Sequence, residues 1–470
     1  MKAIRIGTCT LLAIGVLSFG ATGPGGALIL EIGAAALFAL WGVLAIRREK
    51  VEIHWNWLYV PLIALGVIAI VQYVFGLSVY PYLTKIELLK WSAYGLLFFL
   101  TTESFRTEEQ RGQFVWFLLG LGFAVSLFGI IQHFTFNGKI YWLVSLPAGA
   151  GPFGPFVDRD HFAGFVELIA PLGLALLLFR SRRREQVPLL LLFTIVPIGA
   201  LVLSASRGGI ISLVVEIALL AFLSRADRTR RKRLLVAVAF ALVAGSFMVW
   251  LGVSKAIQRF EQLSHAGISQ ELRVSIYRDT WRIFVDHPLV GTGLGTLVAV
   301  YPRYASFYDG RTVEHAHNDY LELLADSGVV GGLICLCFIG LLLWRGFASL
   351  QSATSLLARA IVAGSLAACA GLLIHSSVDF NLHIPSNGLL FLLLSCIATA
   401  ESTAASNDHT QPAQTLRIRD KSFNRGKSAD CIESDQTCRS RTLTSWKPDE
   451  SSVLFPHPVS HIPRTRTTVL

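Results

Sequence analysis

The sequence predicts an all-α polytopic membrane protein of about twelve transmembrane helices. Of its 470 residues, 53% are hydrophobic and only 15% are charged, whereas soluble domains usually carry about 25% charged residues. The apolar residues fall into successive stretches close to the roughly 20 residues that a helix needs to cross a bilayer. Basic residues gather in the short segments between these stretches, which is the arrangement that orients a multi-pass membrane protein.

The individual spans are identified from their length and flanking charges, because each stretch is apolar on every face. The charged and then apolar start resembles a signal peptide, but a second apolar stretch follows closely, so we expect it to remain as the first span. The spans form a membrane domain of residues 1–401, and the polar, aperiodic residues 402–470 predict a cytoplasmic, disordered tail. The predicted spans are 4–20, 27–46, 57–76, 86–102, 114–134, 161–179, 187–205, 210–223, 234–253, 329–344, 360–378 and 387–401.

The orientation of the membrane domain follows from its basic residues. If the N-terminus is cytoplasmic, every basic cluster falls in a loop on the cytoplasmic side, as the positive-inside rule requires. Both termini are then cytoplasmic, and the opposite side receives the long loop 254–328 together with several shorter polar turns. The same placement accounts for the formal net charge of +10, so we expect contact with membrane lipids and none with nucleic acid.

The first candidate for chemistry is EHAHND at residues 314–319, where the long loop meets a predicted span. Histidine is the side chain best suited to accept a proton near neutral pH. We therefore expect His317 either to act as a base or to cap or anchor the helix, with His315 in a supporting role. The following Asn318 is a good N-cap residue, so capping and chemistry can coexist in this segment.

The second candidate is Arg207, a single arginine in SASRGG between two apolar stretches. An arginine at membrane depth costs roughly 2.5–3.5 kcal/mol, which indicates either a function or interfacial snorkelling. Arg273 adds a second guanidinium on the same predicted side. Guanidinium groups bind phosphate oxygens bidentately, so the two arginines suit a pyrophosphate-linked lipid. Arg278 lies nearby in sequence and either supports this site or belongs to a solvated helix face.

The third candidates are polar turns at the ends of predicted spans, around residues 151–165 and 375–387. They contain His161 and Asp379, whose side chains are able to contact sugar hydroxyls or to order a pocket. Proline, glycine, asparagine and aspartate are also typical of ordinary turns. Both interpretations remain open for these two segments.

The sequence predicts neither a metal site nor a cofactor. Five of the seven cysteines lie in apolar stretches, where cysteine behaves as a small hydrophobic residue. The other two lack histidine or further cysteine at zinc spacing. Glu31, Glu167 and Glu216 lie inside predicted spans and hint at proton transport, but as isolated carboxylates they form no evident relay.

With these segments in place, the sequence resembles the O-antigen ligase family of bacterial membrane glycosyltransferases. The most specific element is His317-Asn318, followed after nine residues by Gly328 and Gly331, which resembles the outer-loop signature of that family. The SRGG motif at 206–209, the segment from Glu271 and the sequence DHPLVGTGLG at 286–295 also match in order. The resemblance covers about residues 90–400.

The resemblance implies a glycosyltransferase C-type fold that works without metal or cofactor in the bacterial inner membrane. The enzyme would transfer a glycan from undecaprenyl pyrophosphate to an acceptor hydroxyl on the periplasmic face, in surface polysaccharide assembly such as that of lipopolysaccharide. By the same resemblance, Arg207 and Arg273 would hold the donor pyrophosphate and His317 would assist deprotonation of the acceptor. One departure is that aspartates stand at 158 and 160, where the resemblance leads us to expect asparagines, so the resemblance implies no donor contact at these two positions.

The resemblance leaves the acceptor open. A lipid A–core sugar would make the protein a ligase, a second lipid-linked glycan would make it a polymerase, and a protein hydroxyl would make it a protein O-oligosaccharyltransferase. An alternative of another class is a transporter or flippase of lipid-linked glycans, which the number of spans favours. Transporters usually show inverted repeats or broken helices near the membrane midplane, and the sequence predicts neither.

Overall fold

The computed structural model describes residues 1–47, 53–146, 151–179, 184–224, 270–308 and 310–400. The regular secondary structure of this part of the chain is helical, apart from one small antiparallel pairing of β1 (Lys139–Ile140) with β2 (Val144–Ser145). The predicted span 234–253, residues 254–269 of the predicted loop and the predicted tail 402–470 lie outside the described residues.

Every predicted span within the described residues coincides with a helix or with a pair of helices. By length and apolar composition, six helical segments of this part of the chain could cross a membrane. The multi-pass membrane class is thereby supported, whereas the total of twelve spans stays a prediction. The helices are α1 (Lys2–Leu17), α2 (Pro24–Ile46), α3 (Tyr59–Val74), α4 (Pro81–Ser104), α5 (Glu108–Thr135), α6 (Arg159–Glu167), α7 (Ala170–Leu178), α8 (Val187–Ser204), α9 (Arg207–Leu223), α11 (Gln270–Asp286), α12 (Leu297–Val300), α13 (Asp319–Ser352), α14 (Leu356–His375) and α15 (Pro385–Thr399), with short 3₁₀ turns η1 (Phe19–Ala21), η2 (Arg184–Gln186), η3 (Tyr301–Arg303) and η4 (Asn381–His383).

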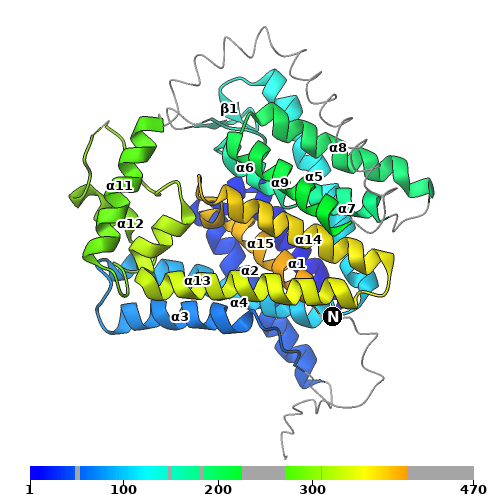
Figure 1. The fold of residues 1–470 in the computed structure, drawn as a ribbon, viewed down its shortest axis with the longest axis horizontal. Helices are drawn as coiled ribbons and strands as arrows, with labels where there is room; N and C mark the ends of the chain where they lie inside the picture. The colour runs from blue at the N-terminus through cyan, green and yellow to red at the C-terminus, as the bar shows by residue number, and fades with distance from the viewer. Residues whose placement is uncertain (48–52, 147–150, 180–183, 225–269, 309, 401–470) are drawn as a thin grey trace, which may run out of the picture. The chain divides into compact units, whose positions relative to one another are not determined.

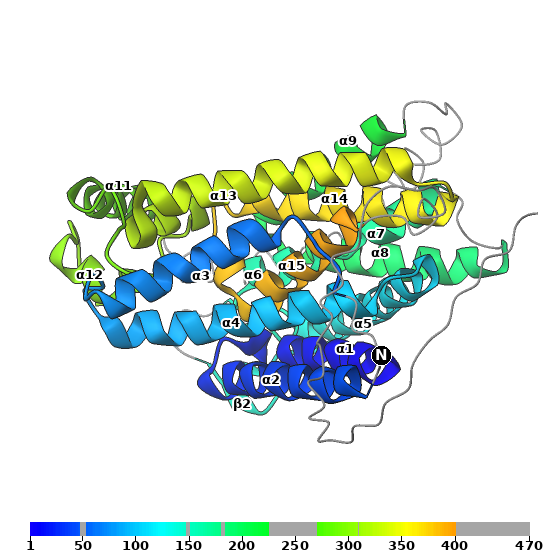
Figure 2. The same ribbon diagram turned by 90° about the horizontal axis from the view of Figure 1, so that it is seen from below.

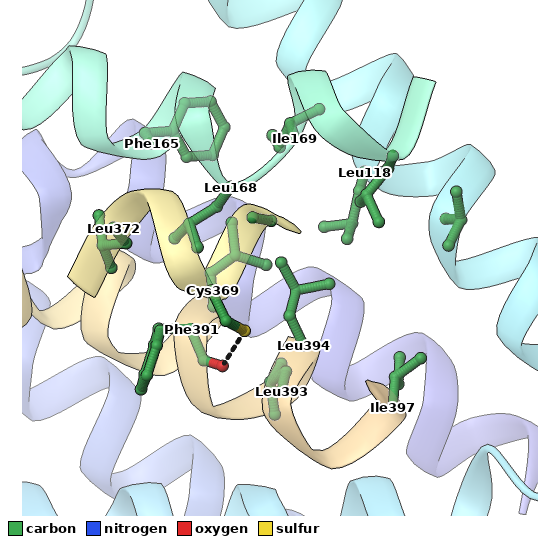
Figure 3. Close-up of a cluster of buried hydrophobic side chains, with 14 of the residues drawn as sticks. Leu118, Phe165, Leu168, Ile169, Cys369, Leu372, Phe391, Leu393, Leu394 and Ile397 are labelled. Atoms are coloured by element: carbon green, nitrogen blue, oxygen red, sulfur yellow. Dashed lines mark hydrogen bonds between the residues drawn. The ribbon is translucent and has the colours of Figure 1, made fainter. Parts of the chain in front are cut away.

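Helix α14 lies near the centre of the bundle, where it packs against α7, α9, α13 and α15 (Figure 1). Its small residues let neighbouring backbones approach closely, as is common in membrane helices. A Cβ on Gly364, for example, would lie 3.0 Å from the Cα atom of Leu172. Figure 3 shows the adjoining apolar core, in which Cys369 of α14 lies among leucines of α15 and residues from the junction of α6 and α7.

The predicted span 161–179 is not one continuous helix but the pair α6 and α7, separated at Leu168 and Ile169. Pro171 lies in the first turn of α7; it lacks a backbone N–H and disfavours helical geometry in the residue before it. Both residues at the break are fully buried. The expectation that the spans contain no broken helix is therefore wrong at this point.

The described part of the predicted long loop is folded rather than extended. Helix α11 packs against α13, and α11 and α12 lie at one end of the long helices (Figure 2). A small apolar core supports this end, separate from the main core. Its buried members are Ile276, Ile283, Leu297, Val300, Tyr301, Ala316 and Ala325.

Helix α13 begins at Asp319, ten positions before the predicted start of the span at 329, and it kinks at Gly328. The sequence 286–295 docks on this kink through backbone hydrogen bonds, among them Gly293 N to Asp326 O at 3.0 Å. Gly328 has φ +63°, and a Cβ there would lie 2.3 Å from the backbone of Leu289. The predicted loop therefore overlaps the first turns of α13, because acidic residues in those turns conceal the helix from a search for apolar stretches.

We expect Gly328→Ala to destabilise the protein, because alanine strains a positive φ and collides with the backbone of Leu289. Backbone strain of this kind costs about 1–3 kcal/mol before the collision is counted. The measurement is thermal unfolding of the purified protein in detergent. Gly340→Ala in the same helix is the matched control, since its Cβ would meet nothing within 4 Å. Equal unfolding temperatures for both variants would contradict the prediction.

Candidate active site

The start of α13 is tied to the turn that follows α14. The Oδ1 atom of Asn318 accepts hydrogen bonds from the backbone N–H groups of Tyr320 and Leu321, at 3.1 and 3.0 Å. Its Nδ2 atom donates to the carbonyl of Ser377 at 2.9 Å, and the backbone N–H of Asp319 donates to the carbonyl of Ser376. Asn318 therefore caps the helix, and the side chain of His317 is left for another role.

His317 is held against a buried carboxylate. Its Nδ1 atom lies 3.2 Å from Oδ1 of Asp379. Its backbone has the left-handed φ of +51°, and its carbonyl accepts a hydrogen bond from the hydroxyl of Tyr277 at 2.8 Å. Backbone geometry of this kind is uncommon for a residue other than glycine and tends to occur at functional sites.

Asp379 is ionised in this setting. Burial alone would raise its pKa, but the hydrogen bond from His317 and the charges of neighbouring histidines lower the pKa below the ordinary value of an aspartate. An ionised carboxylate accepts the proton on Nδ1 of His317. The other ring nitrogen, Nε2, is then the one that is able to accept a proton.

Phe380 brings three of the predicted histidines together. The rings of His161, His315 and His317 lie 4.6, 4.4 and 4.9 Å from the ring of Phe380, measured between centroids. These side chains come from α6 and from the segment before α13, far apart in sequence. The Nε2 atom of His161 is buried without a hydrogen-bond partner in the described part of the chain. The structure thus forms one cluster from polar turns that the sequence predicted separately.

Arg273 reaches the same cluster from α11. Its Nη1 atom donates to the carbonyl of Val378 at 3.2 Å, and its Nη2 atom lies 3.9 Å from Oδ2 of Asp160. The guanidinium is therefore adjacent to Asp379. The carboxylate of Asp160 offsets part of the positive charge of Arg273.

Arg207 is placed next to the cluster rather than in it. It is the exposed first residue of α9, and the side chain of Ser206 caps that helix by accepting from the backbone N–H of Gly209 at 3.1 Å. Among the described residues, no hydrogen bond or ion pair joins Arg207 to His317 or Arg273. Arg278 is exposed on α11.

The turn that carries Arg207 rests on a buried ion pair that the sequence did not predict. Nδ1 of His375 lies 2.8 Å from Oε1 of Glu167, and both side chains are almost fully buried. A Cβ on Gly208 would lie 2.4 Å from the imidazole of His375. The carbonyl of His375 in turn accepts the backbone N–H groups of Val378 and Asp379. Glu167 is thus not isolated. The free-energy cost of placing a carboxylate in an apolar stretch was the one signal in the sequence that Glu167 needs a partner.

A second polar group that the sequence analysis did not bring together shares His315 with this cluster. Nδ1 of His315 lies 2.8 Å from Oε1 of Glu322, and Nδ1 of His383 lies 2.6 Å from Oδ1 of Asp319. Although burial lowers the pKa of His383, the two carboxylates raise it to about 9. The spacing of Asp319 and Glu322, three residues apart in a helix, was a signal that they share one face.

Comparison with known protein families adds one finding. Residues 192–337 match the family model described as O-antigen ligase. No curated protein matches the chain. The matched range includes Arg207, Arg273 and His317. The resemblance to the O-antigen ligase family that the motifs indicated is therefore confirmed over the part of the chain that carries α8, α9, α11, α12 and the first half of α13.

Proposed function

We propose that this protein is an inverting membrane glycosyltransferase that transfers a glycan from an undecaprenyl-pyrophosphate carrier to an acceptor hydroxyl on the periplasmic face of the inner membrane. The family match supports glycosyl transfer in surface polysaccharide assembly. The observation that carries the proposal is the His317–Asp379 pair at the start of α13, with the guanidinium of Arg273 beside it. A base next to a phosphate-binding cation is what this transfer requires.

His317 acts as the base in this proposal. Asp379 accepts the proton on Nδ1, so Nε2 is available to the acceptor hydroxyl. As the acceptor oxygen bonds to the anomeric carbon, the bond from that carbon to the pyrophosphate oxygen breaks with its electron pair, and the hydroxyl proton passes to Nε2. A positioned base of this kind contributes about 100- to 10,000-fold to the rate.

The arginines stabilise the leaving group. Negative charge develops on the pyrophosphate as the glycosidic bond breaks, and fixed cations at that position lower the barrier. Arg273 is held in place by the carbonyl of Val378 and by Asp160, while the exposed Arg207 would engage the pyrophosphate from the start of α9. Because the arginines supply this positive charge, we propose that the transfer step itself uses neither a metal nor a cofactor.

The identity of the acceptor distinguishes three related glycosyl-transfer activities. Ligase, polymerase and protein glycosylase would share the donor site described above and differ in the groove for the acceptor. The experiment supplies the purified protein with a labelled undecaprenyl-pyrophosphate glycan and with each acceptor in turn. We expect one acceptor to become labelled and undecaprenyl pyrophosphate to be released. Intact donor binding without a product from any acceptor would overturn the proposal.

A transporter of lipid-linked glycans is the second candidate, and two observations favour it. The segment α6–α7 is a broken helix, and Glu216 is buried with both carboxylate oxygens unpartnered among the described residues. The pairing of His317 with Asp379, however, has no evident use in moving a lipid. Movement of labelled donor across proteoliposome membranes, without formation of any glycosidic bond, would favour the transporter.

A further inference from the structure

We propose that His315, Glu322 and His383 form a binding site for a divalent metal ion of the zinc class at the start of α13. The site is distinct from the His317–Asp379 pair, and its occupancy can be measured without any assay of glycan transfer. Its ligands come from three segments: the residues that precede α13, the first turn of α13, and the 3₁₀ turn η4.

The donor atoms already lie close to the spacing that a metal requires. His315, Glu322 and His383 each offer one ligand atom, and these three atoms lie within 4.8 Å of one another. The two distances to Oε1 of Glu322 are 2.8 Å from His315 and 3.3 Å from His383. Zinc bonds to nitrogen and oxygen are about 2.0–2.2 Å long, so neighbouring ligands of a tetrahedral site lie roughly 3.3–3.6 Å apart. Small side-chain movements are enough to reach that geometry.

The side chains of the proposed ligands have the hydrogen-bond partners that are usual in metal sites. Histidine ligands usually donate their second ring N–H to a carboxylate or carbonyl, which fixes the nitrogen that faces the metal. Asp319 does this for His383, because its Oδ1 atom lies 2.6 Å from Nδ1 of that ring. The Oε2 atom of Glu322 accepts the backbone N–H of Ala316 at 2.8 Å, which leaves Oε1 for a metal.

Access and charge also suit a cation. Glu322 is only 2% exposed, whereas His315 and His383 are 30% and 20% exposed, so an ion is able to enter from the histidine side. With both imidazoles neutral, the carboxylates of Asp319 and Glu322 leave two negative charges, which a divalent ion neutralises. Three protein ligands leave a fourth position for water.

The consequence for the protein is structural. Phe380 directly precedes η4 and contacts the ring of His315, and His317 lies in the sequence between His315 and the start of α13. A bound ion would hold η4 and the start of α13 together and so stabilise the arrangement of the His317–Asp379 pair.

The experiment titrates Zn²⁺ into the full-length protein, purified in detergent with a tag that contains no histidine and stripped with a chelator. We expect one zinc per chain by elemental analysis and a rise in unfolding temperature with zinc concentration. Glu322→Gln and His383→Gln should each weaken zinc binding at least tenfold, and Asp319→Asn should weaken it about 10- to 100-fold. His54→Gln removes a different histidine–carboxylate pair, with Glu103, and should leave zinc binding unchanged.

Two results would overturn the proposal: stripped wild-type protein that takes up no zinc, or uptake that is the same in Glu322→Gln as in wild type. The unfolding temperature of each metal-free variant, compared with that of the metal-free wild type, distinguishes loss of the fold from loss of the metal site. If a variant unfolds early, the more exposed His315→Gln takes its place. Tetrahedral cobalt absorption in the wild type, lost in His315→Gln, would support the proposal, and its retention in that variant would count against the proposed ligands.

Discussion

Replacing His317 with alanine should abolish glycan transfer while leaving donor binding intact. In the proposed mechanism, His317 is the base that takes the proton from the acceptor hydroxyl. Without it, the rate of transfer should fall at least about 100-fold, which is the lower end of what a positioned base contributes. Product formation from labelled donor measures the effect in vitro. In cells, the donor lipid should accumulate on the periplasmic face.

Two further variants sharpen the test of His317. His287→Ala changes another histidine of the same region, one that lies outside the cluster, and should transfer glycan at the wild-type rate. Asp379→Asn keeps the size of the side chain but offers the ring a neutral partner, so we expect a smaller loss than with His317→Ala. Normal transfer by His317→Ala would remove this residue from the mechanism.

Replacing Arg207 with lysine should also be severely damaging, although the charge is conserved. An ammonium group lacks the planar fork with which a guanidinium binds two phosphate oxygens at once. Arg207 is exposed at the start of α9, so its guanidinium is accessible to a ligand. We expect a higher KM for the donor together with a lower kcat, because the developing charge of the leaving group is also less well stabilised.

The control for Arg207 is an exposed arginine outside the cluster. Arg303→Lys, in the short turn after α12, makes the same chemical change and should leave donor kinetics as in wild type. If Arg207→Lys keeps near-wild-type activity, its positive charge alone is sufficient and the bidentate role is wrong. Saturation curves with the labelled donor distinguish these results.

The membrane class and the approximate positions of the apolar helices were predictable from the sequence. Apolar stretches mark spans because each must avoid exposing polar groups to lipid, and this signal is local. The cap at Asn318 was predictable for the same reason, since capping depends on the residues directly adjacent in sequence. The family resemblance rested on short motifs whose glycines, such as Gly328, are required by close backbone contacts.

The pairings of the candidate site were not predictable in this way. His317 and Asp379 are 62 residues apart, and Glu167 and His375 are 208 apart. Such contacts depend on which helices pack together, and a hydropathy pattern that is apolar on every face carries no information about that choice. The early start of α13 was missed because Asp319, Glu322 and Asp326 lower the hydropathy of its first turns.

The position of His375 has a consequence for how the site responds to change. Its ring supports Gly208, next to Arg207, and its carbonyl holds the backbone of Asp379. The helix start that carries Arg207 and the turn that carries Asp379 therefore both pack against His375. Free energies of substitution at Gly208 and at Asp379 should then be non-additive, as expected for residues that are coupled through a common neighbour.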